Sequence, residues 1–212
     1  MKILLINDNL DEKGGAEKHF FHLIGTLQSL SKKNPKYSTY VLGFSRFKKS
    51  DSNITRLSLP RTKLGRHMSR LFFYPFTYRK IRKKIIELNP DIIHIHNINI
   101  HTSSVLLACR GFRVIHTVHD YSLICPTLWN IHTGGTPCIT GLKIRCIHKH
   151  KRDFSWPIYV SQLYAFAIKR ILVKLIIKKF IAPSQELARY LQLQGFSNIE
   201  VIPTNIKQIN PY

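Results

Sequence analysis

The chain has 212 residues, of which 44% are hydrophobic, and it carries 33 Lys and Arg against 11 Asp and Glu for a formal charge of +22. This length suits one sizeable α/β core, and this apolar content excludes an intrinsically disordered chain. The charge favours polyanionic partners, which include nucleic acid, an anionic membrane leaflet and phosphorylated substrates. A lysine-rich surface that is merely solvated is the alternative.

The pattern along the chain alternates between strands and helices. Residues 2–7 form an apolar run typical of a strand buried on both faces, and helical spacing of apolar residues follows over 16–30. Further strands are predicted at 37–44, 91–96, 114–118, 180–183 and 200–203. Further helices are predicted at 73–88, 102–109, 157–177 and 185–194, and Tyr74-Pro75 argues that the first of these starts at that pair. The pattern predicts a doubly wound parallel sheet of Rossmann-like α/β class.

Neither of the two most apolar segments of the chain has the pattern of a membrane-spanning or export segment. Asn7 and Asp8 directly follow the first apolar run, which therefore lacks the apolar length of a signal peptide. Lys and Arg interrupt residues 156–181, which fall short of the ~20 nearly uncharged residues that span a bilayer. We expect a cytoplasmic protein whose four cysteines form no structural disulfide.

Polar residues gather where the predicted strands end, which is where such sheets bind ligands. Gly14-Gly15 separates the first strand from the first helix, where free backbone N–H groups favour an anion. The GxGxxG and GxxxxGK[ST] patterns are absent, which disfavours an ordinary NAD enzyme or P-loop NTPase. A plain turn would use the same glycines, and His119-Asp120 could simply cap a strand.

Several motifs together resemble the N-terminal domain of glycosyltransferase family 4. They are KILLIND, GGAEKHFFHLIGTL, PDIIHIHN, VIHTVHDYSLICP and FIAPSQELARYLQLQGFSNIEVIP, in that order along the chain. The resemblance covers residues 1–205 and implies the acceptor-side domain of a two-domain GT-B enzyme. Such enzymes use a nucleotide sugar as donor, a glycan or lipid-linked acceptor and no metal for the transfer itself.

The resemblance also implies roles for particular residues. Gly14 and Gly15 would approach the donor diphosphate, with Glu17 opening the helix behind them, and His119 would contact the transferred sugar and the acceptor as the catalytic-site histidine. The remaining residues expected to bind substrate are His96, Asn97 and Asp120.

Residues 206–212 would begin the linker to a donor-binding domain, which the resemblance places after Pro203. We therefore expect sugar transfer in cell-surface polysaccharide or lipopolysaccharide synthesis once a separate donor-binding half is supplied. The alternatives are a non-catalytic acceptor-binding or regulatory subunit, a truncated gene product, or a basic nucleic-acid-binding protein. The last lacks helix-turn-helix, zinc-finger and ribonucleoprotein signatures.

An irregular excursion at 121–153 holds cysteines and histidines, as some family members do at this point. It permits a structural zinc, although no CxxC pair is present and thiols packed under a loop are the default. The candidate ligands are Cys125, Cys138, Cys146 and His150.

Basic and aromatic residues interleave from 61 to 84, which permits a helix lying on an anionic membrane; a core helix with a solvated lysine face is the alternative. The candidate surface residues are Arg79, Lys80, Arg82, Lys83 and Lys84. With lipid-linked acceptors in view, we expect peripheral attachment to the inner face of the cytoplasmic membrane.

Overall fold

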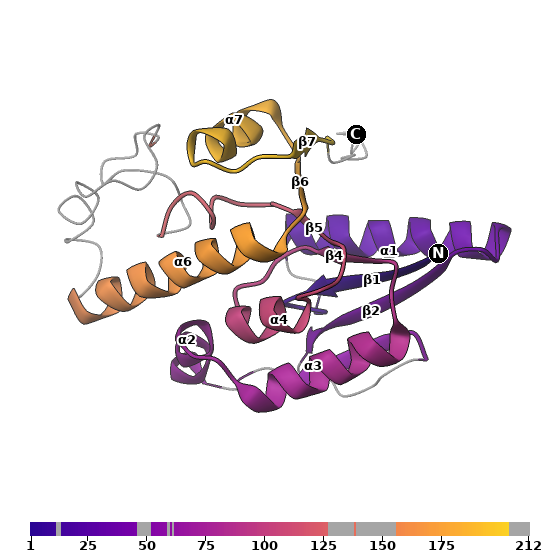
Figure 1. Cartoon of the computed structure of the whole chain (residues 1–212), viewed down its shortest axis with the longest axis horizontal. Helices are drawn as coiled ribbons and strands as arrows, with labels where there is room; N and C mark the ends of the chain where they lie inside the picture. Colours follow the sequence, from indigo (N-terminus) through magenta and orange to yellow (C-terminus); the bar gives the residue numbers. More distant parts are fainter. Residues whose placement is uncertain are drawn as a thin grey trace, which may run out of the picture.

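One parallel sheet organises the molecule. The computed structural model describes residues 1–11, 14–45, 52–58, 60, 62–126, 138 and 156–203. Within them, seven strands lie in the order β3-β2-β1-β4-β5-β6-β7, and every neighbouring pair is parallel. The strands are β1 Lys2–Asn7, β2 Ser38–Ser45, β3 Ile54–Ser58, β4 Ile92–Ile95, β5 Val114–Thr117, β6 Lys179–Ala182 and β7 Ile199–Val201. The predicted doubly wound sheet is confirmed (Figure 1).

Helices pack on both faces of this sheet (Figure 1). The helices of the described residues are α1 Gly15–Lys33, α2 Lys63–Leu71, α3 Pro75–Leu88, α4 Thr102–Ala108, α6 Trp156–Ile176 and α7 Gln185–Leu193. Helix α1 packs on the strands in the smaller core cluster, and buried side chains of α3, α4, α6 and α7 pack on them in the larger one. In this part of the chain, no helix combines the length and apolarity that crossing a bilayer requires.

Strand β1 explains why both faces need cover. Leu4 and Ile6 belong to the larger core cluster, whereas Ile3 and Leu5 join the smaller one with Phe20 of α1. Successive side chains of a strand point to opposite faces of its sheet, so a continuous apolar run buries both. This run suits the interior position of β1, which has a neighbouring strand on each side.

The sequence analysis does not predict strand β3 or helix α2. Strand β3 lies at the sheet edge, and four of its five residues are half-buried, so its apolar pattern is weak. Helix α2 has nine residues, and Ser69 is the only fully buried one among those whose burial is described. The Thr62 hydroxyl caps its N-terminus by accepting from Gly65 N at 2.9 Å. Helix α3 begins at Pro75, as the Tyr74-Pro75 pair predicts, and ends at Asn89 in a left-handed conformation.

Helix α3 offers a matched pair of positions that tests the core. We expect Ile85→Ala to lower the free energy of unfolding by about 2–5 kcal/mol, because it leaves a cavity at a fully buried site. Ile86→Ala should change it by no more than about 0.5 kcal/mol, because that neighbour is 58% exposed. Urea unfolding followed by circular dichroism measures both; equal losses would contradict the placement of α3.

Candidate functional site

The carboxyl ends of β1, β4 and β5 meet at one edge of the sheet. Strand β1 pairs with β4, and β4 pairs with β5, so the residues that follow these strands become neighbours. Asp8 N donates to Asn97 O at 2.8 Å, and Asn97 N donates to the Asn7 side-chain oxygen at 3.0 Å. Helix α1, which follows β1, packs on one face of the sheet, whereas α3, α4, α6 and α7 contribute to the core on the other face. The strand order also reverses at β1, because β2 lies on one side of it and β4 on the other. Such a switch point is the usual place for a ligand in these sheets.

Two histidines form a direct pair at this edge. His96 Nδ1 and His119 Nε2 lie 2.9 Å apart, and the two rings stack with centroids 5.2 Å apart and an interplanar angle of 20°. A hydrogen bond between two imidazole nitrogens needs one donor and one acceptor, so at least one ring is uncharged. The other ring nitrogen of His96, Nε2, is buried and has no hydrogen-bond partner among the described residues.

A third histidine, His19 of α1, joins this pair. Its ring lies edge-on to His119, with centroids 5.3 Å apart, and 6.1 Å from that of His96. The sequence analysis misses His19. The available signal is its helical spacing, because a residue four positions after Gly15 lies on the same side of the helix as the glycine turn.

Burial keeps these imidazoles uncharged. It lowers the pKa of His119 to about 4, assisted by the charge of His19 and opposed by Asp120. Burial likewise lowers the pKa of His19 and brings that of His96 well below its ordinary value. At neutral pH the cluster therefore consists of neutral rings, each with one donor and one acceptor nitrogen, which suits the hydroxyl groups of a sugar. A base this weak positions a hydroxyl group rather than deprotonating it.

The glycine turn lies beside the histidines. Gly14 begins α1 with no side-chain cap, so the helix N-terminus keeps backbone N–H groups available. A Cβ at Gly14 would lie 2.9 Å from Glu17 Oε2, and Asn97 donates its side-chain amide to Glu17 Oε1 at 3.4 Å. Glu17 thus connects the turn to the residue after His96, so the glycine turn and the histidines lie on one rim of the sheet.

A buried charged network lies beneath this rim and was not predicted. Asp8 is buried and accepts backbone N–H groups from Asn99 and from Ile100, the latter at 3.1 Å. The Lys169 ammonium of α6 donates to Asn99 Oδ1 and to Ser122 Oγ, both at 2.9 Å. Burial raises the pKa of Asp8 to about 7 and lowers that of Lys169, whose charge Asp120 and Asp8 support. The signal that could have found it is the helical spacing of Lys169, which lies three residues after Phe166 and four before Val173 on the buried side of α6.

Asp120 has a local role in this arrangement, because its Oδ1 accepts from Ser122 N at 2.9 Å. This bond closes the turn after His119. Because Asp120 directly follows His119 in the sequence, the backbone joins the network to the histidine pair.

The family follows from this geometry together with the sequence. Residues 13–207 match the family model described as Glycosyltransferase Family 4. The chain belongs to glycosyltransferase family 4. A search of curated proteins finds no match.

Solved structures with the same fold include two glycosyltransferases and an epimerase. The lipopolysaccharide outer core galactosyltransferase WaaB is 15% identical with a TM-score of 0.54 over 97% of this chain and 46% of its own. WaaG, a glycosyltransferase involved in lipopolysaccharide biosynthesis, is 10% identical with a TM-score of 0.53 over 97% and 46%. The UDP-GlcNAc 2-epimerase from Neisseria meningitidis, bound to UDP-GlcNAc, is 13% identical with a TM-score of 0.50 over 95% and 45%. This family 4 chain therefore spans less than half the length of each.

The cysteines of the excursion are only partly described in this family 4 chain. Cys125 and Cys138 are buried. Cys146 and His150 lie outside the described residues. The described ranges contain no group of three or more side chains arranged to hold a metal ion, and the zinc site stays a prediction.

The basic residues predicted for a membrane surface separate into two groups. Arg79, Lys80 and Lys83 are exposed on α3. Arg82 instead donates to Ala108 O and Arg110 O at 2.9 and 2.7 Å, so its guanidinium faces the protein. Lys84 is also half-buried, and its ammonium and that of the exposed Lys83 each lie 3.9 Å from a Glu87 carboxylate oxygen. Three of the five cations remain available to a partner.

Gly43 of β2 holds the loop that carries Asp8. A Cβ at Gly43 would lie 2.5 Å from Asn7 O and 2.7 Å from Leu10 Cγ, so only glycine admits this close crossing. We expect Gly43→Ala to lower the free energy of unfolding by about 1–3 kcal/mol through overpacking. The matched change Gly25→Ala in α1, where a Cβ meets nothing within 4 Å, should raise it by about 0.4–1 kcal/mol. Thermal unfolding measures both, and a neutral Gly43→Ala would contradict the crossing.

Stability should depend on pH through histidines that are buried as neutral rings. Burial lowers the pKa of His94 and of His116 from 6.5 to about 3. The unfolded chain takes up these protons below pH 6.5, whereas the folded protein does not until about pH 3. Their stabilisation is therefore complete above pH 6.5 and declines as the pH falls from there toward 3.

Each ring should add about 1.4 kcal/mol per pH unit to the slope of the free energy of unfolding against pH across that window. Urea unfolding at several pH values gives the slope, and His116→Gln should make it shallower by roughly this amount. An unchanged slope would contradict a neutral His116 in the folded protein.

Proposed function

We propose that this chain is the acceptor-side half of a nucleotide-sugar glycosyltransferase that serves cell-surface polysaccharide or lipopolysaccharide assembly. The observation that carries the proposal is the cluster of uncharged histidines beside a glycine turn, in a family 4 chain. Two structures of similar fold belong to glycosyltransferases of lipopolysaccharide synthesis, which supports this setting. A third was solved with UDP-GlcNAc, which supports a nucleotide sugar as donor.

The proposed reaction requires a second half. Residues 1–205 would form the acceptor-side domain, 206–212 would begin a linker, and a donor-binding domain would come from the same or a separate polypeptide. The length of the structurally similar proteins supports this division, because the chain spans less than half of each.

In this proposal, backbone N–H groups bind the charged diphosphate and neutral histidines bind an uncharged hydroxyl group. Glycosyl transfer develops positive charge on the sugar and negative charge on the departing diphosphate. The backbone N–H groups at Gly14 and Gly15 would receive the diphosphate at the positive end of α1. His119, held by His96, would bind and orient a hydroxyl group, while the leaving phosphate accepts the acceptor's proton. No metal takes part in this scheme.

We further propose that the protein works at the inner face of the cytoplasmic membrane. Arg79, Lys80 and Lys83 would lie near anionic headgroups, where each cation contributes about 1 kcal/mol. Phe76, 70% exposed and 4.4 Å from the Lys80 ammonium, would enter the headgroup layer beside them.

Release of UDP tests the proposed transfer. The full-length protein, or this chain purified with the polypeptide that supplies the donor half, is incubated with UDP-galactose, UDP-glucose or UDP-GlcNAc and lipopolysaccharide core acceptors. We expect His119→Ala to lower kcat/KM about 100-fold, because the acceptor hydroxyl loses its orientation. His22→Ala, a change at an exposed histidine of α1, is the matched control and should leave turnover unchanged.

Two results would contradict the proposal. Equal turnover by the His119→Ala and parent proteins would remove the histidine from the site. Absence of UDP release with every donor, by protein that still binds the acceptor, would favour a non-catalytic acceptor-binding subunit.

A further inference from the structure

The outward face of α6 is apolar along its whole length. The residues on it are large and 44–69% exposed, and they recur every four positions apart from one longer step across Ala167, which is also exposed. We refer to them as the α6 stripe; they are Trp156, Val160, Tyr164, Ile171 and Leu175.

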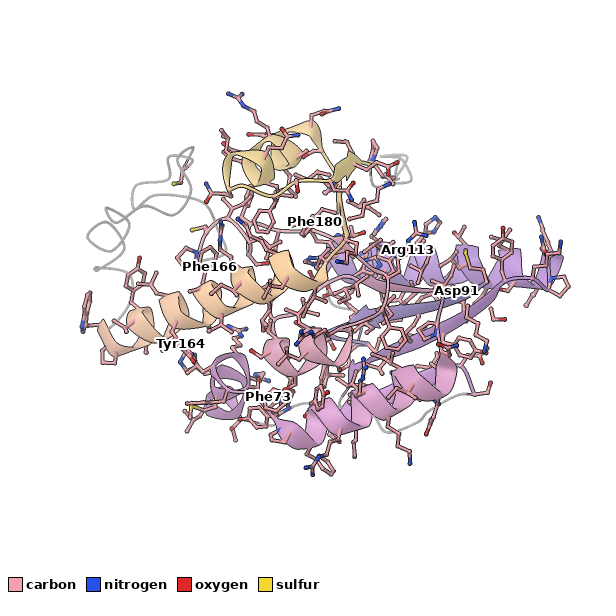
Figure 2. All side chains as sticks on the ribbon, in the orientation of Figure 1. Phe73, Asp91, Arg113, Tyr164, Phe166 and Phe180 are labelled. Atoms are coloured by element: carbon pink, nitrogen blue, oxygen red, sulfur yellow. The ribbon has the colours of Figure 1, made fainter. Side chains whose placement is uncertain are left out.

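This face lies opposite the one that packs on the protein. The buried residues of α6 are Tyr159, Phe166, Lys169, Val173 and Ile176, and at 100° per residue their mean direction lies roughly 160° from that of the stripe. Figure 2 shows Tyr164 and Phe166 on opposite sides of the α6 ribbon. A helix at the surface of a soluble domain normally carries charged residues on its outward face. The stripe departs from that rule over 21 residues, or roughly 30 Å.

The charges near the stripe have one sign. No Asp or Glu occurs between Asp153 and Glu186, so α6 and β6 contain no acidic residue. Lys174 and Lys178 are exposed at the C-terminal end of the stripe. Helix α2, which packs against α6 through the 2.9 Å contact between His67 Nε2 and Ser161 Oγ, is likewise free of acidic residues.

These charges decide what can cover the stripe. A second copy of the chain would bring another +22 charge to the interface, so self-association meets strong repulsion. An anionic surface gains from the same field. Trp and Tyr have an apolar body and a polar tip, which suits the boundary between headgroups and acyl chains.

We propose that the α6 stripe is a docking surface for an anionic lipid bilayer, on which α6 lies flat in the headgroup layer. The inference rests on the proposed membrane location and deepens it by naming the element that enters the lipid. Exposed cations of α3 act at a distance through the field, whereas the stripe buries apolar area.

Vesicle sedimentation tests the docking surface with the chain alone. The chain is mixed with vesicles of phosphatidylglycerol and phosphatidylethanolamine, or of phosphatidylcholine, and the bound fraction is measured at 50 and 500 mM NaCl. We expect binding to the anionic vesicles, weakened but not abolished by salt. The double change Ile171→Gln with Leu175→Gln should lower the partition at least about tenfold, because two apolar side chains no longer enter the lipid.

Leu193→Gln is the matched control, because Leu193 is 62% exposed on α7, outside the stripe. It should bind as the parent does, and circular dichroism verifies that every variant folds. If the double variant binds like the parent and 500 mM NaCl removes all binding, the cations act alone and the inference is wrong. Equal binding to phosphatidylcholine would overturn the preference for anionic lipid.

Light scattering tests a second copy of the chain as the occupant of the stripe. A dimer that the double variant dissolves, in protein that binds no vesicle, would assign the stripe to a second copy and overturn the inference. The vesicle measurement uses no nucleotide sugar, so its outcome is distinguishable from that of the UDP-release assay. Vesicle binding by protein that releases no UDP would leave the docking surface standing and remove the proposed transfer.

Discussion

A buried carboxylate and a buried ammonium hold the functional edge of this protein together. Asp8 follows β1 and accepts backbone N–H groups from the segment after β4, while Lys169 of α6 joins that segment to Ser122 after β5. A buried polar group without a partner would cost several kcal/mol, so both side chains depend on the hydrogen bonds that they make to these loops. The network makes three loops that are distant in sequence into one rim.

The same burial determines the chemistry of the rim. Imidazoles removed from water lose their protons, and the lowered pKa of His119 leaves it a neutral partner of His96. A neutral ring can donate and accept hydrogen bonds with hydroxyl groups, and it adds nothing to the +22 charge of the chain. In the proposed function, phosphate binding is assigned to the backbone of the glycine turn. Under that proposal, the sugar and the anion are bound by different groups on one rim of the sheet.

The structure shows which of the many cations are exposed to solvent. Arg82 is turned inward against backbone carbonyls, whereas Arg79, Lys80 and Lys83 point to solvent from the same helix. The outward side of α6 adds apolar area and no acidic group. Together these surfaces offer a physical use for the charge that does not involve nucleic acid, namely attraction to an anionic leaflet followed by apolar contact.

The sequence by itself determined the strand and helix alternation, the parallel sheet and the strand-end segments, because each depends on the periodicity of neighbouring residues. It also determined the family through ordered motifs. Only the tertiary structure decided which side chains meet. The short edge strand β3, His19 beside His119, Lys169 beneath the rim and the inward turn of Arg82 all depend on partners far along the chain. Local pattern carries no information about such partners, because strand order and helix packing bring them together.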